Sequence, residues 1–260
     1  EYVKYHNNVF YKLATLKNVG SPLGISGLNA PGRYMSDIFI KGNSEYISIK
    51  IEKLKELEEI DPDYASFFYS FLLYESINLI WSSRNFEKPI KQKNINLADG
   101  VKTGGDIVNT KRIKNSAFLA FLDDDDLDEL IHYANIRLFS AGEYVTLEGT
   151  KSDGINILLK GKVEASFTNL KDDQLENNSR SIARTGVALS LSSGLHDIES
   201  PYSLKSTRDT TILKFSNEFI DNLIKTNPKL AIKFFKRQLW QLSRYIQSST
   251  GLTTYPAKNE

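Results

Sequence analysis

The feature that most constrains this chain is an internal repeat. Residues 45–83 resemble residues 210–249, and residues 7–28 resemble residues 177–195. At a constant offset of 166 positions the longer segments share identical residues, which are Pro62 and Pro228, Ala65 and Ala231, Phe68 and Phe234, Leu73 and Leu239, and the serine pairs 82–83 and 248–249. We therefore expect a duplicated unit whose two copies fold alike.

Each copy has the pattern of a strand, a short helix, a break and a longer helix. In the second copy Leu213 and Phe215 alternate with Ile212 and Lys214, as in a half-buried strand. A short helix is predicted over residues 217–226, because proline disfavours helix at the residue before it. Pro228 is suited to open the next helix. The first copy predicts the same for residues 51–60 and the helix that follows.

The region between the copies differs in composition. Residues 84–115 are polar, rich in lysine and asparagine, and contain Gly104-Gly105, which is typical of a linker. One or two helices are expected over residues 117–134, and strands over residues 144–147, 155–159 and 162–167, with glycines at the turns. The predicted division is the C-terminal half of a first domain (residues 1–84), a linker (85–115), a second domain (116–250) and a tail (251–260).

Composition and motifs exclude several classes of protein. The 33 Lys+Arg and 32 Asp+Glu give a formal net charge of +1, so the whole chain is no polycation built for nucleic acid. Without cysteine there are no disulfides, zinc-thiolate sites or cysteine catalysis, which fits a reducing, cytoplasmic location. No membrane-spanning segment or signal peptide is visible. The chain begins at Glu1 rather than Met, so we expect a fragment.

Nothing in the sequence argues for catalysis or for a metal. The three histidines lie far apart with no ligand spacing, and neither a nucleophile-elbow nor a P-loop motif occurs. Six of the seven residues in 123–129 are acidic, but a calcium loop needs a glycine at its sixth position, where this chain has Asp128. Carboxylates at a helix N-terminus explain the run better. We expect neither an enzyme nor a resident cofactor.

Residues 118–167 place a run of short strands after a helix, with glycines at Gly142, Gly149, Gly154 and Gly161. This segment resembles the cyclic nucleotide-binding domain superfamily, which includes the catabolite activator and protein kinase A regulatory subunits. The resemblance covers residues 116–249, and residues 7–83 resemble the final half of the same domain. It implies a mainly β fold with flanking α-helices, in two cyclic-nucleotide-binding-like β-rolls (double-stranded β-helix or jelly roll), the first incomplete in this chain. Tight turns between the strands would require positive φ at the glycines.

In that family a phosphate-binding cassette holds the ligand. A Gly-Glu pair opens a short helix, the Glu accepts the ribose hydroxyl, and an Arg eight or nine residues later pairs with the cyclic phosphate. Helix N-terminal amides and an arginine both suit an anion. The first copy has Gly24, Ile25 and Ser26, followed by Arg33. It keeps a Gly and an Arg but has Ile where the family has the carboxylate.

The second copy departs further from the family pattern. Ser192, Ser193 and Gly194 stand in its cassette, and Tyr202 follows Pro201 where the family has Pro-Arg. Losing that charge-assisted pair typically costs several kcal/mol, on the order of a thousandfold in affinity. We expect this copy not to bind cyclic nucleotide in the family manner. Arg184 and Arg208 could substitute, but neither lies at the motif position. For Arg33, a phosphate ligand and a solvated loop arginine both remain open.

Two further patterns have alternative interpretations. Residues 222–259 carry basic but no acidic side chains. This fits either the solvent-exposed face of an amphipathic helix or a surface that binds an acidic partner, anionic lipid or nucleic acid. Aromatic residues at helical spacing fit a core or an inter-domain seam better than a ligand box, and these are Tyr64, Phe67, Phe68, Phe71 and Trp81.

The sequence predicts a non-enzymatic regulatory or scaffold module with degenerate cassettes that acts mainly through protein–protein interaction. Self-association through residues 64–81 or 230–246 is one form of it. The first alternative is a live cAMP or cGMP sensor whose ligand is held by the first copy. The second is a basic-helix module that binds nucleic acid or an anionic membrane, which is the weaker hypothesis. A DNA-binding helix-turn-helix does not fit after Gln247.

Overall fold

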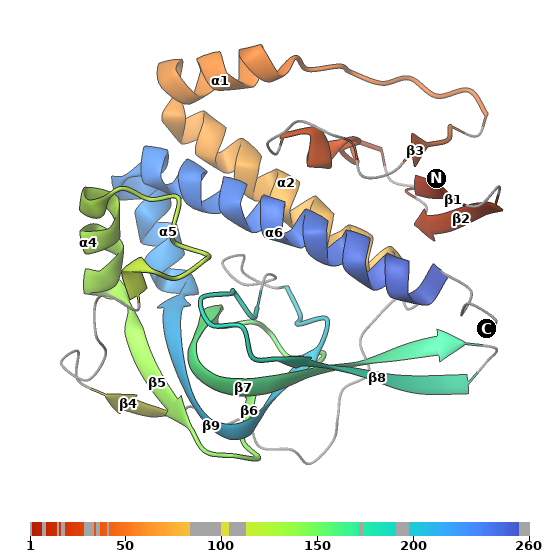
Figure 1. The fold of residues 1–260 in the computed structure, drawn as a ribbon. Coiled ribbons are helices and arrows are strands. Elements are labelled where there is room, and N and C mark those ends of the chain that lie inside the picture. Colours follow the sequence, from red (N-terminus) through yellow and green to blue (C-terminus); the bar gives the residue numbers. More distant parts are fainter. Residues whose placement is uncertain are drawn as a thin grey trace. The chain divides into compact units, whose positions relative to one another are not determined.

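The computed structural model describes residues 2–6, 9–14, 16, 19–28, 34, 37–40, 42–83, 100–103, 113–171, 174–190 and 198–254 (Figure 1). Backbone contacts divide the chain into two compact units. Unit 1 consists of residues 1–85 and 227–260, and unit 2 of residues 86–226.

Unit 2 is built on an antiparallel sheet. Its strands are β4 (Val101–Thr103), β5 (Asn135–Phe139), β6 (Tyr144–Thr146), β7 (Gly154–Lys171), β8 (Gln174–Ile182) and β9 (Ser203–Ser216). The order is β4-β5-β9-β7-β8, and β6 also pairs with β9. Figure 1 shows β5, β7 and β9 as strongly curved ribbons. The predicted mainly β fold with flanking helices is confirmed, and β4 lies inside the region predicted as a linker.

The centre of this sheet is covered on both faces. Leu213 and Phe215 of β9 are fully buried, as the alternation predicts. Ile212 is fully buried as well, and it lies opposite Leu158 of β7, which is also buried. Successive strand residues point to opposite faces. The prediction that β9 is only half buried is therefore wrong at Ile212.

A bulge replaces one of the predicted turns. The strands expected over residues 155–159 and 162–167 form the single strand β7, whose register against β9 shifts between Leu158 and Val163. Gly161 lies there with φ +103°, and a Cβ on it would come 2.6 Å from the Cα of Thr210. A bulge bends a strand without ending its pairing. The expected positive φ is confirmed at all four glycines named above.

Two helices flank the sheet of unit 2. Helix α4 (Asp124–Tyr133) begins in the acidic run, and the Asp123 side chain accepts a hydrogen bond of 2.9 Å from the Asp126 N–H. This confirms that the carboxylates stand at a helix N-terminus. Lys114 pairs with Asp124 at 2.8 Å. Hydrogen bonding to Asp124 raises the pKa of the Lys114 ammonium.

Aromatic rings connect the end of the sheet to both helices. Helix α5 has the predicted bounds, Asn217–Thr226. The Phe219 ring of α5 lies 5.5 Å from that of Phe215 in β9, measured between ring centroids. The same ring also stacks on Tyr133 of α4 at 5.1 Å. Strand β9 and helices α5 and α4 are therefore joined by one column of rings.

Unit 1 combines a small sheet with long helices. Its elements are β1 (Tyr2–His6), β2 (Val9–Ala14), the 3₁₀ helix η1 (Ile25–Leu28), β3 (Asp37–Ile38), α1 (Ile51–Ile60), α2 (Pro62–Ser83) and α6 (Pro228–Thr254). Helix α1 has the predicted bounds. Helix α2 packs against α6, with Leu73 and Ile77 of α2 and Phe234 and Phe235 of α6 fully buried.

Polar contacts also join the three helices of unit 1. The Tyr69 hydroxyl of α2 donates to the Glu58 carboxylate of α1, and Lys236 of α6 pairs with the same carboxylate, both at 2.6 Å. Lys229 pairs with Glu59 at 2.7 Å. Burial, reinforced by the Glu58 carboxylate, raises the pKa of Tyr69. The Lys229 hydrogen bond lowers the pKa of Glu59.

The small sheet of unit 1 repeats part of the topology of unit 2. Its order β2-β1-β3 matches β8-β7-β9, since in both a hairpin is joined by a later strand that pairs with the first strand of that hairpin. A ten-residue helix and a proline-initiated helix follow each time. That the chain holds two tandem rolls, with the domain boundaries given above, stays a prediction.

Candidate functional site

The structure describes both ends of the second-copy cassette. The leading segment is residues 186–190 and the closing segment is residues 198–202. Ser192, Ser193 and Gly194 lie outside the described residues, whereas Tyr202 lies within them. The site is therefore built from the two segments and the strands that hold them.

The leading segment runs antiparallel along β7 and pairs with it through one bridge, between Ala188 and Ile157. The Gly186 N–H donates to the Leu158 carbonyl at 2.6 Å, and the Leu158 N–H donates to the Val187 carbonyl at 3.0 Å. The Leu189 N–H donates to the Asn156 carbonyl at 2.6 Å. Because backbone groups carry these bonds, the cassette begins in a fixed position on the sheet.

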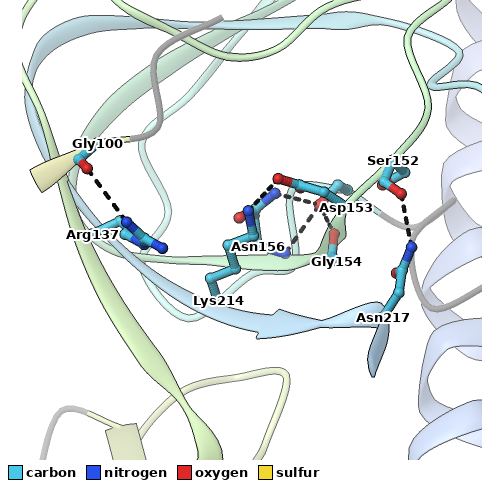
Figure 2. Close-up of polar contacts among 9 residues, drawn as sticks. Gly100, Arg137, Ser152, Asp153, Gly154, Asn156, Lys214 and Asn217 are labelled. Carbon is cyan, nitrogen blue, oxygen red and sulfur yellow. Dashed lines mark hydrogen bonds and ion pairs between the residues drawn. The ribbon is translucent and has the colours of Figure 1, made fainter. Parts of the chain in front are cut away.

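Ser190 anchors the end of the leading segment. Its fully buried hydroxyl accepts hydrogen bonds from the backbone N–H and the side-chain amide of Asn156, both at 3.0 Å. It also donates to the Gly154 carbonyl at 3.3 Å. Figure 2 shows Asn156 and Gly154 close together where β7 begins, with Lys214 of β9 reaching Asp153 beside them. The leading segment therefore leaves the sheet at a buried group of hydrogen-bonded polar residues.

The closing segment is held by the turn that follows β6. The Gly149 N–H donates to the Ser200 carbonyl at 2.9 Å, and the Ser200 N–H donates to the Thr150 carbonyl at 2.8 Å. The Ser152 N–H donates to the Ile198 carbonyl at 3.1 Å. Both ends of the cassette are therefore tied to the roll by backbone hydrogen bonds.

Tyr202 joins the two ends of the cassette. Its side chain is 4% exposed, and its hydroxyl donates to the Leu189 carbonyl at 2.5 Å. At the position where the resemblance places an arginine, the chain has a neutral ring that points inward. Its one hydroxyl proton is used by the backbone of the leading segment. A phenol in this state offers no positive charge to a phosphate.

Glu148 is a buried acid that the sequence did not reveal. Its side chain belongs to a residue that is only 2% exposed, and its carboxylate accepts from the backbone N–H of Thr168 at 3.2 Å and from the Thr168 hydroxyl at 3.3 Å. The Glu148 N–H donates to the Ser203 hydroxyl at 2.9 Å. Residues 145–149 are all buried, so no alternation marks this position as inward-facing.

In the first copy, the described cassette residues form a compact turn. Gly24 precedes η1, which contains Ile25 and Ser26, and the Gly27 N–H donates to the Gly24 carbonyl at 2.9 Å. Arg33 lies outside the described residues. The Tyr34 ring packs on this turn, since a Cβ on Gly24 or Gly27 would come 2.8 or 2.9 Å from it.

The arginines that could substitute in the second copy have other surroundings. Arg208 donates to the Gly161 carbonyl at 3.3 Å, at the bulge between β7 and β9. Arg184 is exposed just after the end of β8. Their part in ligand binding stays a prediction.

The structure of unit 1 shows the surroundings of the basic helix α6 and of the aromatic helix α2. Lys229 and Lys236 of α6 face the α1 carboxylates described above, and the Arg237 guanidinium lies 4.2 Å from the Trp240 ring centroid. On α2, Tyr64, Phe67 and Phe71 are exposed, so a core position is wrong for these three. The Trp81 side chain lies outside the described residues.

Neither a candidate metal centre nor a membrane-spanning helix is found among the described residues. Among them no group of three or more His, Cys, Asp or Glu side chains could hold a metal ion. No described helix has the length and apolar character that a membrane crossing requires.

Comparison with solved structures identifies the fold. A cyclic nucleotide-binding domain from Methylobacillus flagellatus KT matches with a TM-score of 0.51 and 15% identity, over 62% of this chain and 92% of that one. The Thermus thermophilus catabolite activator protein matches at 0.43 and 20%, over 52% and 61%. The regulatory subunit of a cAMP-independent protein kinase A from Trypanosoma brucei matches at 0.43 and 18%, over 54% and 49%. No family model and no curated protein matches the sequence. The chain has the fold of a cyclic nucleotide-binding domain.

Proposed function

We propose that this chain, which has the fold of a cyclic nucleotide-binding domain, is a non-enzymatic regulatory or scaffold module that acts through protein contacts. In this proposal the second cassette is degenerate and binds no cyclic nucleotide. The fold then serves to present surfaces.

The observation that carries the proposal is the contact between Tyr202 and Leu189. A live cassette needs a cation that faces the cyclic phosphate, because an anion held without a charged partner loses affinity by orders of magnitude. At the sequence position where the resemblance expects that cation the chain has Tyr202, whose buried phenol donates to the Leu189 carbonyl at 2.5 Å. Opening the site would require breaking this hydrogen bond and exposing a buried ring, and both steps cost free energy.

The first cassette supports the same interpretation. Tyr34 follows Gly27 by seven residues, and Tyr202 follows Gly194 by eight. The Tyr34 ring lies against Gly24 and Gly27, so it covers backbone that a phosphate would have to approach. A tyrosine thus occupies the cassette region of each copy. The ion pair of Lys236 with the part-buried Glu58 likewise favours a structural role for this lysine of α6 over nucleic-acid or membrane binding.

A calorimetric titration tests the proposal. The purified chain is titrated with cAMP and then with cGMP, up to about 1 mM nucleotide. We expect no heat of binding and no increase in the melting temperature from either nucleotide. Tyr202→Phe should give the same result, because it removes only the hydroxyl. Micromolar binding by the wild-type chain at a stoichiometry near one would contradict the proposal.

The live sensor remains the alternative, and one variant separates it from the proposal. If the wild-type chain binds nucleotide, Arg33→Ala tests whether the first copy is responsible. Loss of binding in that variant would assign the phosphate to Arg33. Unchanged affinity would exclude the first copy as the family-type site.

A further inference from the structure

An exposed aromatic stripe runs along α2. Tyr64, Phe67, Phe71 and Tyr74 are 57%, 67%, 39% and 43% exposed. They follow one another at spacings of three, four and three residues, which places them on one face of the helix. This is the spacing of a coiled-coil seam. A contiguous apolar patch of this kind on a folded unit marks an interaction site.

The rest of α2 shows that the stripe is separate from the core. Leu72, Leu73 and Ile77 are buried in unit 1, where α2 packs against α6. Asp63 and Glu75 are the two charged residues between Pro62 and Ser83. The four aromatic positions themselves therefore carry no charge that would select a charged partner.

The order of residues in the stripe reads the same in both directions. It is Tyr, Phe, Phe, Tyr, with its midpoint at Tyr69. In a two-fold symmetric interface residue i contacts j and j contacts i. Two antiparallel α2 helices centred on this midpoint would place Tyr64 against Tyr74 of the second copy and Phe67 against Phe71. We propose that the stripe is the interface of an antiparallel homodimer of this chain.

The area of the stripe limits how strong the proposed dimer can be. Aromatic side chains bury about 150–250 Å² each, so four that are roughly half exposed would remove about 400 Å² per copy from water. A standard interface buries about 800 Å² per partner. The dimer should therefore be weak, with a dissociation constant in the micromolar range or above, and reversible on dilution. This inference rests on the proposed function as a protein-interaction module and supplies its partner.

Sedimentation equilibrium over about 1–200 µM chain tests the association. We expect a reversible monomer–dimer equilibrium, which Phe67→Glu and Phe71→Glu each weaken at least tenfold. Leu138→Glu is the matched control, because Leu138 is a comparably exposed apolar residue, at 38%, on β5 of unit 2. A wild-type chain that is monomeric at 200 µM overturns the proposal, as does a dimer that both glutamate variants leave intact. If a glutamate variant fails to fold by circular dichroism, Phe67→Ser and Phe71→Ser take its place.

The chain has no cysteine, so introduced thiols test the orientation. At 1.5 Å per residue an antiparallel pair would separate Tyr64 from Tyr64 of the other copy by about 15 Å along the axis. A disulfide needs Cα atoms within about 7 Å. Tyr64→Cys chains mixed with Tyr74→Cys chains should crosslink, whereas Tyr64→Cys chains alone should not. Efficient crosslinking of Tyr64→Cys alone would overturn the antiparallel arrangement. Nucleotide titration is independent of both assays, so a failure of the dimer and a failure of the degenerate-cassette proposal can be told apart.

Discussion

The Tyr69 hydroxyl donates to the Glu58 carboxylate at 2.6 Å and so links α2 to α1 within unit 1. Lys236 of α6 pairs with the same carboxylate. One half-buried acid thus receives contacts from two other helices, and the three helices of this unit share a polar centre in addition to their apolar packing.

Tyr69→Phe should destabilise unit 1 by about 1–2 kcal/mol, because it removes a hydrogen bond to a charged group. The free energy of unfolding in urea, followed by far-UV circular dichroism, measures the loss. Tyr64→Phe is the matched control on the same helix, because that ring is exposed and the change should stay within about 0.5 kcal/mol. Equal losses in both variants would contradict the assigned role of the hydroxyl.

The same contact predicts a pH dependence. Burial, with Glu58, raises the pKa of Tyr69 above its ordinary value of 10.0, so the folded state favours the protonated phenol. The resulting stabilisation is fully present below about pH 10 and is lost as the pH rises from there through the folded-state pKa. The stability difference between wild type and Tyr69→Phe should therefore shrink above about pH 10. A difference that grows with pH in this range would show that the sign is wrong.

Gly161→Ala should destabilise unit 2 by more than 2 kcal/mol. The new Cβ would lie 2.6 Å from the Cα of Thr210 in addition to a strained φ of +103°. Gly142→Ala measures the backbone strain alone, because Gly142 has φ +95° and nothing within 4 Å of its would-be Cβ. The difference between the two variants is the cost of the steric clash. The control should cost about 1 kcal/mol in thermal unfolding. Similar losses at both sites would exclude a close approach at the bulge.

Glu148→Leu should cost about 1–3 kcal/mol, because the buried Thr168 N–H would lose its acceptor, while the Thr168 hydroxyl can still donate to Asn177 Oδ1 at 3.2 Å. Glu148→Gln should cost less, since the amide oxygen can still accept one of these bonds. Glu164→Gln on β7 is the matched control at a partly exposed position and should change the free energy of unfolding by less than about 0.5 kcal/mol. A neutral result for Glu148→Leu would contradict the buried contacts.

Lys236→Met should lower the stability of unit 1 by about 1 kcal/mol, because Lys236 is partly exposed and its partner Glu58 is more buried. Lys229→Met should have no measurable effect, since Lys229 and Glu59 are both exposed. Thermal unfolding at low and high salt compares the two. A larger effect for Lys229→Met would show that the exposed pair with Glu59, and not the pair of Lys236 with Glu58, stabilises unit 1.

The helices were predictable from the sequence because local signals fix their ends. Asp61-Pro62 and Asn227-Pro228 stop α1 and α5 where the structure does, since the residue before a proline disfavours helix. The glycines of the roll were predictable as positive-φ positions for a similar local reason. The bulge at Gly161 was not, because a turn and a bulge both require such a glycine and only pairing with β9 distinguishes them.

The contacts that define the site depend on residues far apart in sequence, and these were not predictable. A tyrosine after Pro201 indicates that the arginine is missing, but not that its hydroxyl reaches Leu189. The bond from Thr168 on β7 to Glu148 in the turn after β6 joins positions twenty residues apart. Short polar β4 carried no strand signal, because its partner β5 supplies the hydrogen bonds that order it.

In unit 2 the rings of Phe215, Phe219 and Tyr133 connect the sheet to α4, whose first turn is acidic. Phe219 contacts both Phe215 and Tyr133, so a shift of α5 would disturb α4 or break a ring contact. The first turn of α4 carries Asp124, Asp125 and Asp126. A displacement of α5 that keeps the stack would therefore move a cluster of negative charge. Such a movement would change the electrostatic potential around the first turn of α4 within about one Debye length, about 8 Å at physiological salt.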